Sequence, residues 1–469
     1  MLTTISNVIT VQDPSPELRQ YAKDQLELPN PEYAKKERMG FWTGRTPKVL
    51  RLYEWNGNSL VLPFGLVREL MPLLRAGEIR NAFSRGTDVQ FGKPFPLYEY
   101  QQRAVVEMVR KTYGILKSPA GSGKTQCALA IIRAFGKKAL WLCHTADLLH
   151  QSKERAEMYM PKELMGTITE GKVNIGSGIT FATVQTMCNV DLDRYRHEWD
   201  TIVVDECHRI SQSATTVSRY QKVLNNLAAR HKIGITATPE RSDGLIMATF
   251  ALIGNVVYEV PEDAVKERVM QVHVRPVETE TEIADACLNP DGTIDYTKLI
   301  KHLTTDAKRT KLIANTIAGE RGHSCLILSD RIAHLEAIRD ALPEEMRSLS
   351  ALITGKMTSR AGKAERQEAI EKMRTGELRY LFASYSLAKE GLDIQRLDRL
   401  FLASPVKFSS VVIQSVGRIA RTFQDKQTPV CYDFVDRQIG FCRRAYGERC
   451  RHYRKLNAVL EFARNNPSS

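Results

Sequence analysis

The sequence predicts an α/β protein with two parallel sheets in tandem, preceded by a small α+β domain. Short apolar, β-branched runs alternate with helix-like stretches twice along the chain. The first series of predicted strands lies at residues 114–118, 139–143, 180–184, 201–205 and 233–237, and the second at 325–329, 351–354, 380–384, 399–403 and 430–435. Such alternation is typical of parallel strands joined by crossover helices. Residues 256–305 contain several prolines and many acidic residues, and are predicted to connect the two series.

Residues 1–95 have a different pattern, in which proline, glycine and asparagine separate short apolar segments. Asn56-Gly57 lies between two such segments and predicts a β-hairpin. We therefore expect an α+β accessory domain over residues 1–95, α/β domains over 96–260 and 261–436, and a basic C-terminal helix over 437–469. The basic residues of this tail are Arg437, Arg443, Arg444, Arg449, Arg451, Arg454, Lys455 and Arg464.

The composition excludes several classes of protein. With 43% hydrophobic and 26% charged residues, the chain is neither largely disordered nor collagen-like. Its nine scattered cysteines lack the density of a disulfide scaffold, which favours a reducing compartment. No apolar run approaches ~18 residues, and the first residues, Met1-Leu2-Thr3-Thr4-Ile5-Ser6, lack the basic-then-apolar pattern of a secretion signal. We expect no membrane association and a cytoplasmic location, either nucleoid-associated or in a phage-infected host. The net charge of +13 favours a polyanionic partner.

A phosphate-binding loop is predicted after the first strand of the first α/β domain, in the segment Ser118-Pro119-Ala120-Gly121-Ser122-Gly123-Lys124-Thr125. Gly121 and Gly123 let backbone N–H groups curl around phosphate oxygens. Lys124 supplies a positive charge to the β- and γ-phosphates, and the Thr125 hydroxyl is a ligand for Mg²⁺. Ser118 stands where the general pattern has its first glycine. The alternative is an ordinary turn before a helix.

Two adjacent carboxylates, Asp205 and Glu206, end the predicted strand 201–205. Ligands bind at the carboxyl ends of parallel strands. Asp205 is predicted to hold magnesium through water, and Glu206 to orient the water that attacks the γ-phosphate. The alternative is a surface acidic pair, which the phosphate loop upstream makes improbable. His208 is predicted to report the γ-phosphate state to the turn that begins at Thr236.

These motifs, in this order, resemble those of superfamily 2 helicases and translocases, whose two RecA-like domains clamp ATP between them. The resemblance covers residues 96–437. Besides the two motifs above, it rests on Tyr98-Glu99-Tyr100-Gln101, Leu140-Trp141-Leu142-Cys143-His144-Thr145, Thr183-Val184-Gln185-Thr186, Thr236-Ala237-Thr238-Pro239, Gly391-Leu392-Asp393 and Gln414-Ser415-Val416-Gly417-Arg418-Ile419-Ala420-Arg421.

The resemblance implies further residues for the ATP site. Gln101 is predicted to bind the adenine, Gly391 and Asp393 to lie near the ribose, and Gln414 to sense the nucleotide. Arg418 and Arg421 lie on one helix face, where planar charges reach the developing charge on the γ-phosphate. A solvated basic helix face is the alternative for this arginine pair. The cofactors are ATP and Mg²⁺.

The resemblance also implies a nucleic-acid track, because Lys and Arg clusters bind phosphate backbones without reading sequence. The candidate contacts are Thr145, Thr183, Gln185 and Thr186 in the first domain and Ser329, Arg331, Thr354, Lys356 and Ser384 in the second. Each of these side chains could instead cap a helix or satisfy a turn.

The motif forms favour DNA. The arginine motif, the Thr-Ala-Thr-Pro turn and residues 240–244 resemble the branch with XPB, type III restriction motors and phage recombination helicases of the UvsW type. We expect an ATP-dependent helicase or translocase, monomeric by default, that remodels single-stranded, forked or Holliday-type DNA in replication, recombination or repair. An RNA helicase, the motor subunit of a restriction complex, or an idle nucleic-acid scaffold are the alternatives.

Two features leave alternatives open. The aromatic residues Phe41, Trp42, Tyr53 and Trp55 could stack on opened bases, but core positions are favoured for several of them. The tail helix could bind the duplex backbone, or pack on the second α/β domain through Leu456, Val459, Leu460 and Phe462, or do both. The spacing of Cys431, Cys442, Cys450 and His452 fits no standard zinc site, which favours packing.

Overall fold

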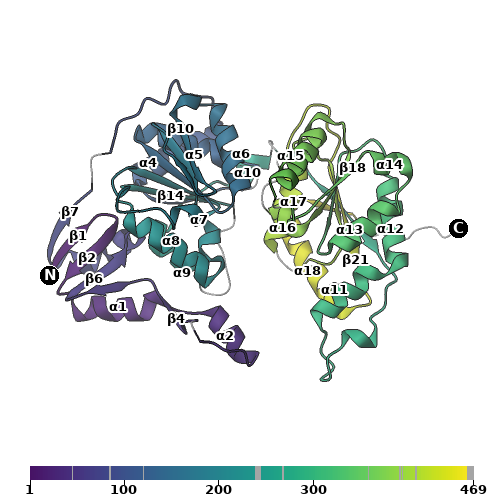
Figure 1. Ribbon diagram of the computed structural model, residues 1–469, viewed down its shortest axis with the longest axis horizontal. Helices are drawn as coiled ribbons and strands as arrows, with labels where there is room; N and C mark the ends of the chain where they lie inside the picture. Colours follow the sequence, from purple (N-terminus) through teal and green to yellow (C-terminus); the bar gives the residue numbers. More distant parts are fainter. Residues whose placement is uncertain are drawn as a thin grey trace. The chain divides into compact units, whose positions relative to one another are not determined.

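The computed structural model describes residues 1–469 except 45, 84–85, 120, 238–244, 267–268, 358, 390–391, 393, 407–408 and 462–469. The chain forms two compact units, Met1–Ala264 and Val265–Ser469 (Figure 1). Each unit contains a large, mostly parallel sheet, which confirms the predicted α/β class.

The first unit is built around an eight-stranded sheet in the order β11-β10-β12-β9-β13-β14-β8-β15, parallel except at the β10–β11 pair. Its strands are β8 (Gly114–Lys117), β9 (Ala139–Cys143), β10 (Met165–Thr169), β11 (Lys172–Asn174), β12 (Ile179–Thr183), β13 (Thr201–Asp205), β14 (His231–Thr236) and β15 (Val256–Glu259). One face is covered by α4 (Glu99–Lys111), α5 (Lys124–Phe135) and α6 (Ala146–Glu157), and the other by α7 (Val184–Met187), α8 (Ala214–Asn226) and α9 (Ile246–Ile253) (Figure 1).

All five strands predicted for this sheet are confirmed to within two residues. Every residue of β9, β12 and β13 is buried, because helices cover both faces, so these strands are continuous apolar runs. The sequence did not predict β10, β11 and β15. These strands lie at the sheet's margins, where burial alternates or is incomplete, and a continuous apolar run is not needed there.

The accessory domain consists of a five-stranded sheet in the order β5-β6-β2-β1-β7 and a separate two-stranded sheet of β3 and β4. The strands are β1 (Leu2–Ile5), β2 (Val8–Gln12), β3 (Glu27–Pro29), β4 (Val49–Arg51), β5 (Glu54–Asn56), β6 (Ser59–Pro63) and β7 (Glu78–Asn81), and the helices are α1 (Pro16–Leu26), α2 (Pro31–Arg38) and α3 (Val67–Leu74). The predicted hairpin is confirmed: β5 and β6 pair antiparallel around Gly57, whose φ of 56° suits glycine.

The accessory domain shares one hydrophobic core with the first α/β domain. Leu62, Phe64 and Leu66 pack in the same cluster as Tyr113, which directly precedes β8, and Ala251 of α9. The contact is close at η1 (Phe64–Leu66), where a Cβ on Gly65 would overlap the carbonyl oxygens of Phe250 and Ala251. The two domains therefore form one packed body within the first unit.

A fully buried lysine lies in this junction. The Nζ atom of Lys232, at the start of β14, donates to the carbonyl oxygens of Asn7 and Leu224, at 2.8 Å each. It also lies 5.0 Å from the centroid of the Phe64 ring. Burial lowers the pKa of Lys232 from 10.5 to about 7. The lysine thus joins the accessory domain to the motor sheet through a group that titrates near neutral pH.

We expect this lysine to make stability depend on pH. Below pH 7 Lys232 is protonated in both the folded and the unfolded chain. From pH 7 toward 10.5, the unfolded chain keeps a proton on Lys232 that the folded chain has released. The free energy of unfolding of the first unit then rises with pH, by about 2 kcal/mol between pH 7 and pH 9. Denaturant unfolding at both pH values should show this rise in the wild type and in the exposed-site control Lys222→Met. An equal rise in Lys232→Met would contradict the assignment.

The second unit has a seven-stranded sheet in the order β18-β19-β17-β20-β21-β16-β22, with every pair parallel. Its strands are β16 (His273–Glu278), β17 (Cys325–Ser329), β18 (Ser350–Ile353), β19 (Tyr380–Ser384), β20 (Arg399–Leu402), β21 (Val430–Val435) and β22 (Val459–Leu460). The helices are α11 (Tyr296–Thr305), α12 (Ala307–Ala318), α13 (Ile332–Asp340), α14 (Glu344–Ser348), α15 (Arg360–Thr375), α16 (Tyr385–Lys389), α17 (Ser409–Ile419) and α18 (Gly440–Lys455), and a short α10 (Asp263–Lys266) spans the boundary between the units.

Alternate residues of β17 supply the two cores of this unit. Leu326 and Leu328 belong to the cluster that includes α17 and α18, and Cys325 and Ile327 belong to the cluster that includes α12 and α13. The five strands predicted for this sheet are confirmed to within one residue. Residues 256–305, which are predicted to connect the two series, also contain β15, β16 and α11.

The C-terminal tail packs on the second sheet. Within α18, the Arg449 guanidinium is buried and forms two hydrogen bonds to Asp433 of β21, at 2.8 Å each. The Tyr453 hydroxyl donates to the same carboxylate at 2.7 Å, and β22 adds to the sheet beside β16. Leu456 and Leu460 pack on the core as the packing alternative expected, and Phe462 lies outside the described residues.

Within the described part of the chain, no helix combines the length and apolar character needed to cross a bilayer. The same residues contain no group of three or more His, Cys, Asp or Glu side chains arranged to hold a metal ion. Cys431 and Cys442 are buried, and neither forms a disulfide.

Candidate nucleotide and nucleic-acid site

The register of the first sheet brings the predicted ATP residues to one edge. β8, β14 and β13 are neighbours and parallel, so their carboxyl ends meet on the same side of the sheet. The phosphate loop follows β8, and Asp205 ends β13. The backbone N–H of Ser118 donates to the carbonyl oxygen of Thr236 at 2.9 Å, which fixes the base of the loop to the end of β14.

The phosphate loop has the backbone that phosphate binding requires. Gly121 and Gly123 have φ angles of 81° and 77°, values that side chains strongly disfavour. Lys124 is the first residue of α5, so the partial positive charge of the helix N-terminus faces the loop. Ala120 lies outside the described residues. The described part of the loop thus presents N–H groups and a cation at one place.

Ser118, which stands where the general pattern has its first glycine, stabilises the loop through hydrogen bonding inside it. The hydroxyls of Ser118 and Ser122 are buried and 2.5 Å apart, and the Ser122 hydroxyl donates to the carbonyl oxygen of Pro119 at 2.7 Å. Ser118 therefore acts as an internal support of a loop in which both Gly121 and Gly123 have positive φ angles.

The predicted adenine residue, Gln101, contacts the loop directly. Its side-chain amide donates to the carbonyl oxygen of Ser122 at 2.9 Å, and its carbonyl oxygen accepts from the Tyr98 N–H at 3.0 Å. The Tyr100 hydroxyl donates to the same Ser122 oxygen at 3.0 Å. Gln101 is almost completely buried. In this conformation it caps α4 and braces the loop, and adenine binding stays a prediction.

The two carboxylates differ in their surroundings. Asp205 is buried and accepts from the Ser152 hydroxyl of α6 at 3.0 Å. Burial, together with the adjacent Glu206 charge, raises the pKa of Asp205. Burial acts in the same direction on Glu206, but Lys124 and then His208 outweigh it and lower the pKa of that carboxyl. Lys124 is therefore close enough to act on both groups.

Glu206 also has an unusual backbone. Its φ of 47° and ψ of 52° lie in the left-handed region, which is rare for a residue with a side chain. The strained conformation turns the chain sharply at the end of β13 and begins η3 (Cys207–Gln212). Such strain is found at functional sites, where the surrounding structure enforces it.

His208 links the acidic pair to the next motif. Its Nδ1 atom lies 3.3 Å from the Glu206 carboxylate and 2.9 Å from the Thr236 hydroxyl. The structure thus brings together the two residues for which a relay was predicted. Thr238, Pro239 and residues 240–244 lie outside the described residues.

The residues present fit a nucleotide and a divalent cation. The glycine conformations and the N-terminus of α5 suit phosphate oxygens, and Thr125 and Asp205 supply the oxygen ligands that Mg²⁺ prefers. The fit depends on the backbone N–H groups of the loop as well as on Lys124, because the lysine charge alone would not supply directed N–H groups to the phosphates.

The nucleic-acid candidates of the first unit lie on the neighbouring half of the same edge. β12 and β9 pair in parallel beside β13. The Thr145 hydroxyl accepts from the Leu148 N–H at 3.4 Å and caps α6, and the Thr183 hydroxyl donates to that of Thr186 at 3.0 Å. The Gln185 carbonyl oxygen is buried. The helix-cap alternative thus holds for Thr145, and its contact with a nucleic-acid backbone stays a prediction.

The second unit shows the same arrangement at its own sheet. Ser329, Thr354 and Ser384 stand at or just beyond the carboxyl ends of β17, β18 and β19, which are adjacent strands. Arg331 occupies the N-cap position of α13 without a capping hydrogen bond from its side chain, and Lys356 follows Thr354 in the loop after β18. The Ser329 hydroxyl pairs with His334 Nδ1 at 2.9 Å, and that of Ser384 with the Ser386 hydroxyl at 2.8 Å.

The arginine motif begins on α17, but Arg421 lies beyond its end in an isolated β-bridge with Val269, so the prediction that both arginines share one helix face is wrong. Arg418 is buried and donates to the carbonyl oxygens of Ala388 and Leu392, so it supports the segment that contains the glycine-aspartate motif. Gln414 is on the same helix, and Arg421 is half-buried beyond its end. Gly391 and Asp393 lie outside the described residues. The roles assigned to these five residues stay predictions.

Sequence reasoning assigned no individual role to Ser152 or His144, although His144 lies in one of the motifs on which the resemblance rests. Ser152 contacts Asp205, and its position inside α6 gives no sign of this. His144 directly follows β9, and burial, followed by the charges of Arg209 and Arg219, lowers its pKa to about 4. A lone serine or histidine in a helical or strand pattern is normally structural, so only the fold could identify these contacts.

The fold and the phosphate-loop site define a nucleoside triphosphate-binding protein with two α/β motor domains. The family model of the type III restriction enzyme res subunit matches residues 94–241, and that of the helicase conserved C-terminal domain matches residues 307–423. Probable helicase D10 of Escherichia phage T5 is 25% identical over 350 residues, covering 74% of this chain and 73% of that protein. DNA 3'-5' translocase XPB2 of Sulfurisphaera tokodaii is 25% identical over 376 residues, covering 71% and 82%.

A solved structure supports the fold. S. cerevisiae Dbp5 bound to RNA and ADP BeF3 aligns with a TM-score of 0.56 at 15% identity, covering 77% of this chain and 89% of that chain. The tandem RecA-like fold is confirmed. The chain belongs to superfamily 2 of the helicases, in the branch that includes XPB and phage helicases. Membership implies ATP binding and hydrolysis, usually with Mg²⁺.

We expect Glu206→Gln to abolish most ATP hydrolysis while leaving nucleotide binding intact, because an amide keeps the shape but cannot activate water. The rate should fall by roughly 10²- to 10⁴-fold, as for the loss of a general base. Steady-state phosphate release and titration with a fluorescent ATP analogue measure the two properties. Glu154→Gln, at an exposed position on α6, is the matched control. Hydrolysis at the wild-type rate in Glu206→Gln would refute this role.

Proposed function

We propose that this protein is an ATP-dependent DNA helicase or translocase that remodels branched DNA, namely forks and four-way junctions. The observation that supports it best is the division of one sheet edge into two halves. The ends of β8, β14 and β13 form the phosphate half, and those of β9 and β12 form the half with Thr145 and Thr183. Because β9 pairs directly with β13, a change at the acidic pair can pass to the track through one strand.

The proposed mechanism assigns a task to each described group. The N–H groups around Gly121 and Gly123 orient the phosphates, and Lys124 neutralises part of their charge. Glu206 accepts the proton of the attacking water and orients it in line with the γ-phosphate. Mg²⁺, when held by Thr125 and Asp205, supplies charge stabilisation to the phosphate oxygens. Arg421, helped by Arg418 and Gln414, stabilises the charge that develops in the transition state.

Two observations favour DNA as the substrate. The XPB2 relative is named a DNA translocase. The Thr236-Ala237-Thr238-Pro239 turn and the Gln-x-x-Gly-Arg-x-x-Arg form of residues 414–421 resemble that branch of the superfamily. The net charge of +13 suits a polyanionic track of either kind. The proposal includes a cytoplasmic location, where the protein acts on DNA.

The direct test is the ATP-dependent conversion of a mobile four-way DNA junction into forked products. We expect conversion by the wild type and loss of it in Arg421→Ala, which should also hydrolyse ATP at least about 10³-fold more slowly, as for loss of an arginine finger. Linear duplex DNA and an RNA duplex are the controls. Equal or faster unwinding of the RNA duplex would favour the RNA helicase alternative, and undiminished hydrolysis in Arg421→Ala would contradict the arginine assignment.

The contact between His208 and Thr236 predicts a separation of hydrolysis from DNA remodelling. Thr236 is buried, and valine matches its shape while removing the hydroxyl that pairs with His208. We expect Thr236→Val to retain ATP hydrolysis within about threefold, yet to lose most junction conversion per ATP consumed. Thr236→Ser, which keeps the hydroxyl, is the control. Equal loss of both activities in Thr236→Val would show that the hydroxyl serves hydrolysis itself.

A further inference from the structure

An arm extends from the accessory domain between β3 and β4. These two strands pair antiparallel, with Leu28 facing Leu50 at the buried base, and the intervening residues 30–48 contain α2 (Figure 1). The buried Asn30 side chain accepts from the Glu32 N–H at 3.0 Å and donates to the Pro47 carbonyl oxygen at 2.7 Å. Lys36 donates to the Thr46 hydroxyl at 2.7 Å. The arm is therefore a closed local structure.

The arm exposes its large apolar side chains. No residue of α2 is buried, and the exposed fractions just after it are 52% for Met39, 59% for Phe41 and 80% for Trp42. A Cβ on Gly44 would overlap the Trp42 indole, so the ring lies against the glycine backbone and leaves its other side open. The sequence favours core positions for several of the aromatic residues Phe41, Trp42, Tyr53 and Trp55, but Phe41, Trp42 and Trp55 are exposed. A cluster of exposed apolar rings marks an interaction site.

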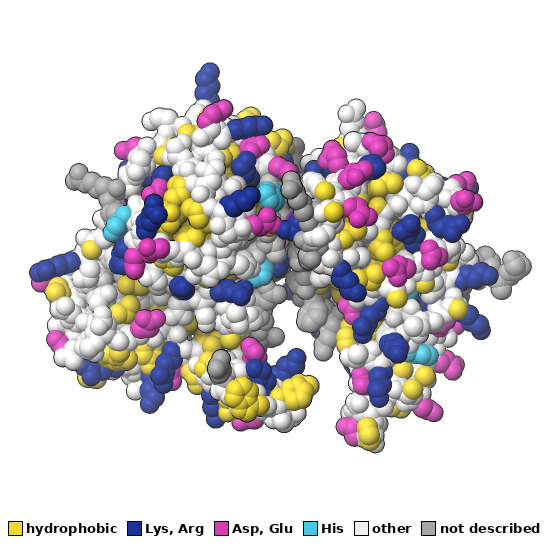
Figure 2. Space-filling view, viewed as in Figure 1, with side chains coloured by type: hydrophobic (Ala, Val, Ile, Leu, Met, Phe, Trp, Pro, Cys, Tyr) yellow, Lys and Arg dark blue, Asp and Glu magenta, His cyan; other side chains and the backbone are white. Residues whose placement is uncertain are grey.

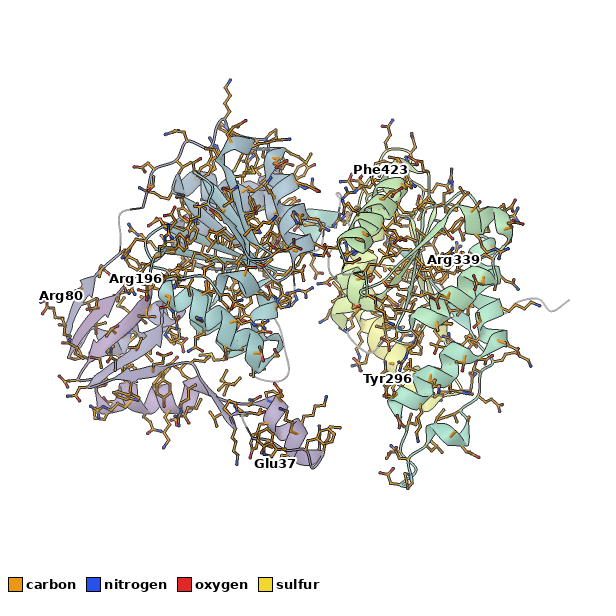
Figure 3. All side chains as sticks on the ribbon, viewed as in Figure 1. Glu37, Arg80, Arg196, Tyr296, Arg339 and Phe423 are labelled. Atoms are coloured by element: carbon orange, nitrogen blue, oxygen red, sulfur yellow. The ribbon has the colours of Figure 1, made fainter. Side chains whose placement is uncertain are left out.

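The surroundings of the rings are basic. Lys35, Arg38 and Lys48 are exposed, and Lys36 is half-buried, against the acidic residues Glu32 and Glu37 of the same arm. Figure 2 shows hydrophobic side chains with Lys and Arg beside them over the region of α2. Figure 3 places Glu37 on this arm, where side chains extend away from the helix into solvent. The cations outnumber the acids and favour a polyanion.

The other tryptophans do not share these properties. Trp141 and Trp199 are buried in the motor domain, with exposed fractions of 0% and 1%. Trp55, on β5, is 48% exposed, but the Arg19 guanidinium lies over its ring at 5.7 Å. Trp42 is thus the tryptophan whose open ring is accompanied by cations. Open aromatic rings among cations stack on unpaired bases, since every base has a π-face.

We propose that the arm, through its described residues 30–44 and 46–48, binds an unpaired DNA strand at a branch point, with Phe41 and Trp42 stacking on bases and Lys35, Arg38 and Lys48 contacting the backbone. The proposal rests on the proposed DNA-remodelling function and adds to it a second contact, outside the two motor sheets. A strand held there is kept from re-annealing beside the motor. Blunt duplex DNA offers the cations a backbone but offers the rings no free base.

The first experiment uses tryptophan fluorescence in the full-length chain. In Trp55→Phe, Trp42 is the exposed tryptophan that remains, because the other two are buried. Adding a forked DNA with oligothymidylate arms should quench its emission, and adding blunt duplex DNA should not. The quenching should vanish when Trp42→Phe is added to the same background. Unchanged emission at saturating forked DNA, with saturation followed by fluorescence anisotropy, overturns the proposal.

The second experiment measures affinity and hydrolysis together. We expect Phe41→Ala with Trp42→Ala to weaken binding of the forked DNA by about tenfold or more, and blunt-duplex binding by less than about twofold. Trp55→Ala, an exposed tryptophan outside the arm, should leave both affinities unchanged. Hydrolysis of ATP with saturating single-stranded DNA should stay near the wild-type rate in all variants. Fork affinity equal to wild type in the double variant refutes the arm proposal.

The outcomes separate the two proposals. If the wild type hydrolyses no ATP with any nucleic acid, the proposed function fails, and the quenching of Trp42 still decides whether the arm binds unpaired bases. If hydrolysis is stimulated and the arm variants bind forks normally, the function stands and the arm proposal falls. Lys35→Glu with Arg38→Glu supplies a further check: fork affinity should drop, and its dependence on salt should become weaker.

Discussion

The parallel register of β8, β14 and β13 is the constraint on which the site depends. Ser118 is hydrogen-bonded to Thr236, and β14 pairs residue by residue with β13. The loop, Thr236 and Asp205 therefore have fixed positions relative to one another along the strand direction. A slip of one residue would turn the end of a strand to the opposite face of the sheet. Burial on both faces resists such a slip. The motor chemistry is therefore positioned by the hydrophobic core, with the polar groups only at the strand ends.

Buried charges hold the second unit together. Arg309 is fully buried and pairs with Asp436 at 3.0 Å, while Arg449 joins the tail helix to Asp433. Arg418 instead satisfies backbone carbonyl oxygens. Guanidinium groups suit such positions because they make several directed hydrogen bonds at once. Part of the positive charge of this unit is thus internal, which leaves exposed cations, such as those of the arm, as the candidates for nucleic-acid contact.

The sequence predicted the central strands well because they are buried on both faces and therefore apolar throughout. It missed β16, where burial alternates and Pro276 interrupts the pattern. Proline is tolerated there because β22 pairs only with His273 and Val274, so the proline nitrogen faces no partner. For the site, the glycine loop and Asp205 follow from motif order. The bracing by Gln101, the Ser152 contact and the exposure of Trp42 depend on tertiary packing, which residue types alone do not specify.

The most direct measurement of the central claim is a crystal structure of the protein with Mg²⁺ and a non-hydrolysable ATP analogue. The account predicts the phosphates against the N–H groups of residues 121–124, and the cation between the Thr125 hydroxyl and the Asp205 carboxylate, with Glu206 directed at the γ-phosphate. A nucleotide bound away from the carboxyl ends of β8 and β13, or carboxylates turned away from its phosphates, would contradict it.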